Sequence, residues 1–255
     1  MIAPLLLALA FQPAPPAPPA PVTGPAGGYS RSITNDMLEF TYEWPAAAEQ
    51  EPVLSALLHQ RLDEAFTTAT RYANEDKASR GGEVPFNVHL YGEGWEVAGE
   101  TGQLMSLTSA VSTYTGGAHG NMHFGAILWD KGADHALDMD SALGGDGLRA
   151  LSPRYCDALD AEREARRGEP VRRGPDELFG DCPDIGEQVV APVDADDNGR
   201  FDTLRVLLPP YAAGPYVEGD YVIDVRLGAD DIARIDARYR PSFEVGTAIT
   251  TRPDG

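Results

Sequence analysis

Residues 37–44, MLEFTYEW, and residues 52–73, PVLSALLHQRLDEAFTTATRYA, decide the fold class. In the first segment apolar side chains alternate with polar ones, which predicts a half-buried strand. In the second, apolar residues recur at spacings of three and four after a proline suited to a first helical position. This pattern predicts an amphipathic helix of about 25 residues that covers one face of a sheet.

The rest of the chain contains further strands and shorter helices. A helix is expected over residues 143–168, interrupted at Ser152 and Pro153, and a short one over residues 229–235. Strands before and between these helices predict an α+β fold, with antiparallel sheets packed with one long N-terminal helix and shorter C-terminal helices. The expected strands are residues 86–91, 94–99 and 103–114, as an antiparallel meander, and residues 121–129, 189–193, 200–208 and 221–227.

The charge of the chain limits its partners. Forty acidic residues against 20 basic ones give a formal net charge of -20 over 255 residues. A phosphate backbone would be repelled, so nucleic-acid binding is not expected. If the charge selects a partner at all, that partner is basic or a cation.

The N-terminal residues predict export. Residues 1–10 contain a short apolar run that ends in Ala-Leu-Ala, which is typical of a signal peptide and its cleavage site. Residues 11–30 are rich in proline and predict an extended linker. The mature protein is therefore expected in the periplasm or outside the cell, with no transmembrane anchor. A start codon placed wrongly would leave a cytosolic protein instead.

Cys156 and Cys182 are the only cysteines. In an exported chain two cysteines can pair once, so we expect a disulfide between them. The alternative, one thiolate acting as a nucleophile, has no histidine nearby in the sequence to support it.

Two motifs resemble a known family. Residues 112–121, STYTGGAHGN, and residues 210–219, PYAAGPYVEG, are similar to the extracytoplasmic domain of RsiV-type anti-sigma factors. The same module also occurs in PdaC-type polysaccharide deacetylases, usually after a small partner module. The resemblance implies a small α+β module at residues 31–114, an RsiV-like α+β module at 115–243 and a tail at 244–255.

The resemblance also implies a function. In RsiV-type proteins this domain binds lysozyme outside the cytoplasm, usually without catalysis of its own. The sequence contains neither a sigma-binding region nor a deacetylase domain, so neither activity is expected here. The implied role is an exported, non-catalytic binding protein of the cell envelope that recognises lysozyme or a cell-wall glycan.

The candidate binding residues lie in and beside the two motifs. Tyr211, Tyr216 and Tyr221, beside Glu218, form an aromatic group that could stack on a glycan or line a protein interface, and core packing is the expected use of at least two of the tyrosines. Tyr114 and His119 come from the first motif. We expect the ring nitrogens of His119 to hydrogen-bond the glycine-rich turn in which it lies. Contact with a substrate is the alternative.

Two patterns raise the question of a metal. His119 and His123 are four residues apart, but glycines around them favour a turn and a strand, in which the two rings lie about 13 Å apart. Residues 194–202, DADDNGRFD, place oxygen ligands as in the first nine positions of a calcium loop. The same residues suit an Asx-rich β-turn between two strands, and both readings stay open. The calcium ligands would be the side chains of Asp194, Asp196, Asn198 and Asp202, with Arg200 contributing its carbonyl.

A second class of function needs such an ion. A metal-dependent hydrolase acting on envelope polysaccharide would hold it at His119, His123 or the loop that begins at Asp194. Its titratable groups would have to converge in one cleft, whereas a binding protein would present a broad aromatic or acidic face.

Overall fold

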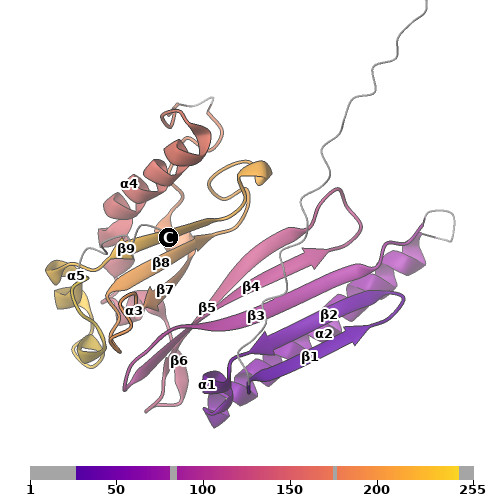
Figure 1. Ribbon diagram of the computed structural model, residues 1–255, viewed down its shortest axis with the longest axis horizontal. Coiled ribbons are helices and arrows are strands. Elements are labelled where there is room, and N and C mark those ends of the chain that lie inside the picture. Colours follow the sequence, from indigo (N-terminus) through magenta and orange to yellow (C-terminus); the bar gives the residue numbers. More distant parts are fainter. Residues whose placement is uncertain (1–26, 81–84, 175–176, 247–255) are drawn as a thin grey trace, which may run out of the picture.

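Two β-sheets form the framework of the molecule (Figure 1). The computed structural model describes residues 27–80, 85–174 and 177–246. A three-stranded antiparallel sheet consists of β7 (Val189–Val193), β8 (Thr203–Leu208) and β9 (Tyr221–Arg226). The six-stranded sheet consists, in spatial and chain order, of β1 (Tyr29–Thr34), β2 (Leu38–Trp44), β3 (His89–Glu100), β4 (Leu104–Tyr114), β5 (Asn121–Asp130) and β6 (His135–Leu137).

Helices accompany both sheets, which confirms the α+β class. The long ones are α2 (Pro52–Ser79) and α4 (Gly147–Arg167), and α1 (Ala46–Glu49), α3 (Met139–Ala142) and α5 (Ala229–Arg234) are short. Single 3₁₀ turns occur at Ile185–Glu187, Tyr216–Glu218 and Arg240–Ser242. No helix in the described ranges is both long and apolar enough to cross a membrane. The predicted signal peptide, most of the predicted linker and residues 247–255 of the predicted tail lie outside the described residues.

The first core lies between α2 and the six-stranded sheet. Every second residue of β2 is buried, so the alternation in residues 37–44 does mark a half-buried strand. Helix α2 begins with Pro52 at its first turn and connects β2 to β3, and these two strands pair in parallel. A helical crossover returns the chain to the same end of the sheet, which makes this pair parallel. The other pairs in both sheets are antiparallel.

The second core lies around the three-stranded sheet. In Figure 1 this sheet lies between α4 and the six-stranded sheet; β9 contacts α4, and β7 contacts β5. The core includes Leu104 and Leu128 from the six-stranded sheet, so the two sheets share it. The six-stranded sheet also extends past Tyr114, because β5 and β6 complete it. A domain boundary placed between the two sheets would fall after Leu137.

Buried polar contacts tie the C-terminal residues to the first sheet. The Thr101 hydroxyl donates to Ser242 Oγ at 3.0 Å, across 141 positions of sequence. Asp130, which is fully buried, pairs with Arg238 at 3.1 Å. Buried polar groups of this kind are costly unless paired. These pairs therefore fix how the C-terminal residues pack against the six-stranded sheet.

The prediction of two strands at residues 86–91 and 94–99 was wrong. One strand, β3, runs from His89 to Glu100 without a break. Its glycines allow close packing: a Cβ on Gly92 would lie 3.0 Å from Ser112 Oγ and 3.2 Å from Thr41 Oγ1 on the neighbouring strands. Glycine within a strand can therefore mark close approach rather than a turn.

The predicted helix break at Ser152 and Pro153 was also wrong. Helix α4 is continuous with Pro153 inside it. The buried face of the helix has Leu151 before the proline and Tyr155 after it, both at most 1% exposed. An interior proline costs about 3 kcal/mol, and burial of side chains on both sides of it keeps the helix intact.

Candidate functional site

Three of the predicted binding residues meet in one place. His119 lies in the turn between β4 and β5, whereas Tyr211 and Tyr216 lie in the connection between β8 and β9. The His119 ring stacks on Tyr216 with centroids 3.8 Å apart, and the Tyr211 ring lies 5.6 Å from that of Tyr216. We call these three residues the aromatic cluster. It joins two loops that lie more than ninety positions apart in the chain.

The carbonyl oxygen of Gly120 holds the aromatic cluster in place. His119 Nδ1 lies 2.8 Å from this oxygen, and the Tyr216 hydroxyl donates to it at 3.0 Å. A carbonyl can only accept, so Nδ1 donates to it, and in the neutral imidazole Nε2 is then the acceptor. The Tyr211 hydroxyl lies 3.4 Å from Nε2. Both ring nitrogens of His119 therefore face partners within the protein.

Although it is held firmly, the aromatic cluster remains accessible. Tyr211 is 53% exposed and has a φ of 73°, in the left-handed region that tyrosine rarely adopts. Such a conformation costs of order 1–3 kcal/mol and is found mostly at functional sites. Val217, next to Tyr216, is 90% exposed. The connection between β8 and β9 thus presents the exposed side chain of Val217 beside the fixed rings of Tyr211 and Tyr216.

Glu218 lies beside the aromatic cluster and anchors its loop. Arg167 donates to both carboxylate oxygens at 2.9 Å, and Tyr221 also donates to the carboxylate. Burial alone would raise the pKa of Glu218, but the bonds from Arg167 and Tyr221 hold it below its ordinary value. The carboxylate is therefore used to hold the loop on α4. Tyr114, half-buried at the end of β4, pairs with Leu90 and makes no ring contact with the cluster in the described part of the chain.

The acidic loop at residues 194–202 forms a turn between β7 and β8. The two carboxylate oxygens of Asp194 accept from the backbone N–H groups of Asn198, at 3.0 Å, and Gly199, at 2.7 Å. Asp202 is 1% exposed and pairs with Arg226 at 3.1 Å. The Asp194 side chain thus takes up backbone donors of its own loop, as aspartate commonly does in turns.

The loop is also tied to the C-terminal residues. Asn198 donates to Glu244, and the Arg200 side chain pairs with Glu244 and donates to the carbonyl of Phe243. Partial desolvation and, after it, the negative charge of Asp202 raise the pKa of the neighbouring Asp196. Calcium binding by this loop stays a prediction.

No metal cluster is apparent where the structure describes the chain: no group of three or more His, Cys, Asp or Glu side chains is placed to hold an ion. His123 is exposed on β5 opposite Val111. The predicted disulfide between Cys156 and Cys182 is confirmed, with Cα atoms 5.6 Å apart.

A cleft of about 520 Å³ opens between α2 and the six-stranded sheet. Glu93 of β3 lines it, and the Tyr91 hydroxyl donates to Glu93 Oε2 at 2.5 Å. Burial raises the pKa of Glu93, against hydrogen bonds from Tyr91 and Tyr42 that lower it. Our sequence analysis missed this site because it split β3 at residues 92–93. The sequence signal was Glu93, whose side chain lies on the same, buried face of the strand as that of Trp95.

The raised pKa of Glu93 predicts a pH-dependent effect of Glu93→Gln. The penalty of burying this carboxylate is absent below its unfolded pKa, near 4.5, and grows as the pH rises towards the folded pKa. We expect the variant to be more stable than the wild type at about pH 7.5, with a smaller gain at about pH 3.5. Urea unfolding at the two pH values measures this. Glu96→Gln, at an exposed position of β3, should show no such trend, and a Glu93→Gln effect independent of pH would contradict the argument.

Comparison with known families distinguishes one segment of the chain. One family model matches residues 32–122, from within β1 to the start of β5. Its description is Deacetylase PdaC. The chain thus contains a segment that matches the PdaC family. This PdaC segment includes the whole lining of the cleft and also His119, whereas Tyr211 and Tyr216 lie beyond it.

Two solved structures are similar to most of the chain. A member of the DUF3298 family from Bacteroides fragilis is 14% identical, with a TM-score of 0.50, covering 84% of this chain and 95% of its own. A DUF3298 family protein from Pseudomonas aeruginosa is 17% identical, with a TM-score of 0.49, covering 82% and 91%. At this identity the first likeness shows the fold alone. No curated protein matches the chain.

Proposed function

We propose that this protein is an exported, non-catalytic binding protein of the cell envelope, and that the aromatic cluster contacts its partner. The partner we propose is a basic protein of the lysozyme class. A cell-wall glycan bound at the same cluster is the other outcome that the test below distinguishes.

The observation that carries the proposal is the accessible but fixed aromatic cluster. Exposed tyrosines that are already ordered lose little conformational entropy on binding, which is why such residues often dominate interface energies. Tyr211 and Val217 are exposed, while Gly120 and Glu218 hold their loop in place. The cluster can therefore meet a partner surface without rearranging.

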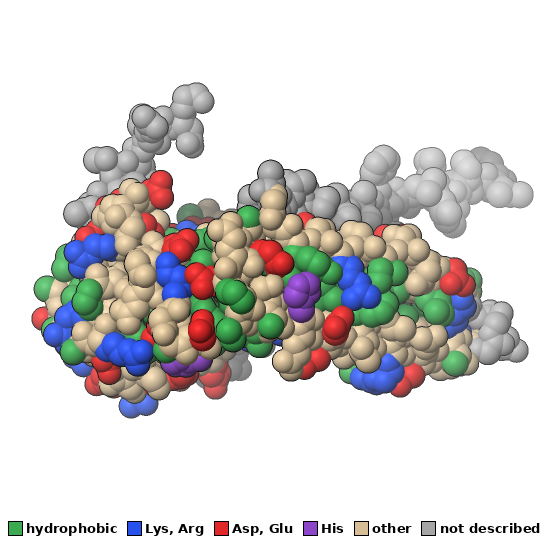
Figure 2. Space-filling model, turned by 90° about the horizontal axis from the view of Figure 1, so that it is seen from below, with side chains coloured by type: hydrophobic (Ala, Val, Ile, Leu, Met, Phe, Trp, Pro, Cys, Tyr) green, Lys and Arg blue, Asp and Glu red, His purple; other side chains and the backbone are tan. Residues whose placement is uncertain are grey.

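The choice of a basic partner rests on charge and on the RsiV-type resemblance. The net charge of -20 attracts a cationic protein and raises its association rate. Figure 2 shows acidic and basic side chains interspersed on the face that it presents, with no large area of a single sign. We therefore assign the charge a role in long-range attraction and the aromatic cluster the role of specific contact.

Export is supported by two features. The disulfide between Cys156 and Cys182 is of a kind that persists in oxidising compartments, and residues 1–10 have the pattern of a signal peptide. The metal-dependent hydrolase has no comparable support, since no observation on the described residues favours it.

The test is calorimetry of the protein with hen egg-white lysozyme at low and at physiological salt. We expect binding that survives physiological salt, and Tyr211→Ala should weaken it about 30-fold, the effect of losing about 2 kcal/mol at an interface hot spot. Binding that disappears with salt would indicate non-specific attraction and contradict specific recognition.

Tyr72→Ala is the matched control for this measurement. Tyr72 on α2 is 52% exposed, almost the same as Tyr211, but lies at the cleft instead of at the aromatic cluster. It should bind lysozyme as the wild type does. If lysozyme does not bind but cell-wall glycan fragments do, and Tyr211→Ala abolishes that binding, the partner is the glycan.

A further inference from the structure

The cleft beside α2 has the size and composition of a small-molecule site. At about 520 Å³ it falls within the range of ligand pockets in proteins. Its apolar lining includes Leu38 from β2 and Ala65 and Ala69 from α2. Pockets that are mainly apolar with a few convergent polar groups are the usual form of such sites.

The polar groups of the cleft come from three separate elements. Arg61 projects from α2, Glu93 from β3, and Thr113 lies at the end of β4. Arg61 lies over the Trp95 ring, 5.5 Å from its centroid, and forms no ion pair with any residue that the structure describes. A half-buried guanidinium with free donors, opposite a carboxyl group and a hydroxyl, can bond a ligand from several directions.

The cleft contains charged groups of both signs. Arg61 faces Glu93 within it, and Glu64 lies at its edge, where it accepts from Gln60 at 2.9 Å. An anionic ligand would meet Glu64 and Glu93, and a cationic ligand would meet Arg61. This balance favours a neutral ligand with many hydroxyl groups.

An aromatic ring completes the lining. Tyr72 of α2 is 52% exposed and lies at the cleft, with the Arg71 guanidinium 4.3 Å from its ring centroid. A sugar ring has apolar C–H faces that pack on aromatic rings, and hydroxyls around its edge that bond planar groups such as guanidinium and carboxyl. The cleft offers both kinds of contact.

We propose that the cleft between α2 and the six-stranded sheet binds a neutral saccharide, which packs on Tyr72 and bonds Arg61 and Glu93. This site is separate from the aromatic cluster and does not depend on lysozyme binding. It lies wholly within the PdaC segment, whereas the aromatic cluster does not.

The experiment is an NMR titration of the full chain with two neutral trisaccharides, tri-N-acetylchitotriose and cellotriose. We expect at least one to bind with a Kd of about 1 mM or tighter. Binding of only the first would assign an acetamido sugar, and binding of only the second a sugar without that group. No binding of either at about 10 mM would overturn the proposal.

Variants locate the site. Arg61→Met keeps an unbranched apolar side chain but removes the guanidinium and its donors, and it should weaken binding about tenfold, as should Tyr72→Ala. Arg172→Met, at an arginine whose side chain is 70% exposed and lies outside both sites, is the matched control and should bind the sugar as the wild type does. Equal binding by Arg61→Met and the wild type would overturn the proposal. Melting curves establish that each variant is folded, and Glu93→Gln is a second variant that tests the same site. Because Arg61→Met tests the cleft and Tyr211→Ala tests the aromatic cluster, failure of one proposal is distinguishable from failure of the other.

Discussion

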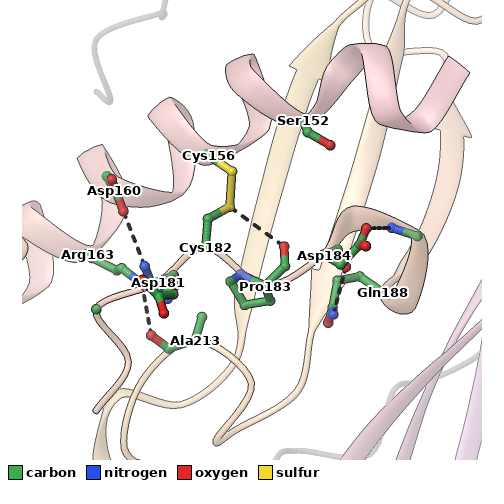
Figure 3. Close-up of a disulfide and its surroundings, with 12 residues drawn as sticks. Ser152, Cys156, Asp160, Arg163, Asp181, Cys182, Pro183, Asp184, Gln188 and Ala213 are labelled. Atoms are coloured by element: carbon green, nitrogen blue, oxygen red, sulfur yellow. Dashed lines mark hydrogen bonds and ion pairs between the residues drawn. A yellow bond between two sulfur atoms is a disulfide. The ribbon is translucent and has the colours of Figure 1, made fainter. Parts of the chain in front are cut away.

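Replacing Arg163 with methionine is expected to destabilise the protein by about 3 kcal/mol or more. Arg163 is fully buried in α4 and donates to the carbonyls of Ala213, at 2.9 Å, and Asp181, at 3.0 Å (Figure 3). Methionine fills much of the same space but donates nothing, so both carbonyls lose this partner. Urea unfolding measures the change, and the melting temperature should fall by about 10 °C.

A surface arginine supplies the matched control for this prediction. Arg172 has a side chain that is 70% exposed and pairs with Glu169 at 3.1 Å. Arg172→Met should change the stability by about 0.5 kcal/mol or less, as is usual for exposed ion pairs. Equal effects of Arg163→Met and Arg172→Met would show that the buried guanidinium contributes little.

Loss of the disulfide is expected to have an effect of similar size. Cys156 lies in α4 and Cys182 in the segment that returns towards the three-stranded sheet (Figure 3), at a sequence separation of 26. Opening a loop of this length releases chain entropy in the unfolded state worth about 3.5 kcal/mol. The double variant Cys156→Ser and Cys182→Ser should therefore unfold at clearly lower urea concentration.

Reduction of the wild type with dithiothreitol tests the same bond without mutation. Reduced wild type and double variant should have the same unfolding midpoint, and reductant should leave the variant unchanged. A wild type whose midpoint does not move on reduction would contradict a stabilising role for the bond.

Some of the fold could be predicted from local patterns, and the rest depends on contacts distant in sequence. The buried face of β2 and the long helix α2 show in the spacing of their apolar residues. Strand β1 was missed because its six residues, YSRSIT, are mostly polar, and pairing with β2 makes it a strand. Pro153 misled the prediction for α4 because packing on both sides of it outweighs the local cost.

The same distinction applies to the two candidate sites. His119, Tyr211 and Tyr216 were found because they lie in two recognisable motifs, yet no pattern showed that the Gly120 carbonyl would bring them together. The cleft was missed because its polar groups lie on separate elements. Arg61 by itself is typical of a solvated helix face, and its relation to Glu93 exists only in the folded chain.

The packing of Phe243 has a consequence for the order of folding. Its ring lies 5.2 Å from that of Phe201, both side chains are fully buried, and Phe201 and Phe243 form a β-bridge. The second core draws on residues from Leu104 to Phe243, so it cannot be completed until Phe243 is free to pack. Contacts of such long range form slowly. This core therefore closes only after most of the chain has been synthesised, an order of folding that is compatible with the export proposed above.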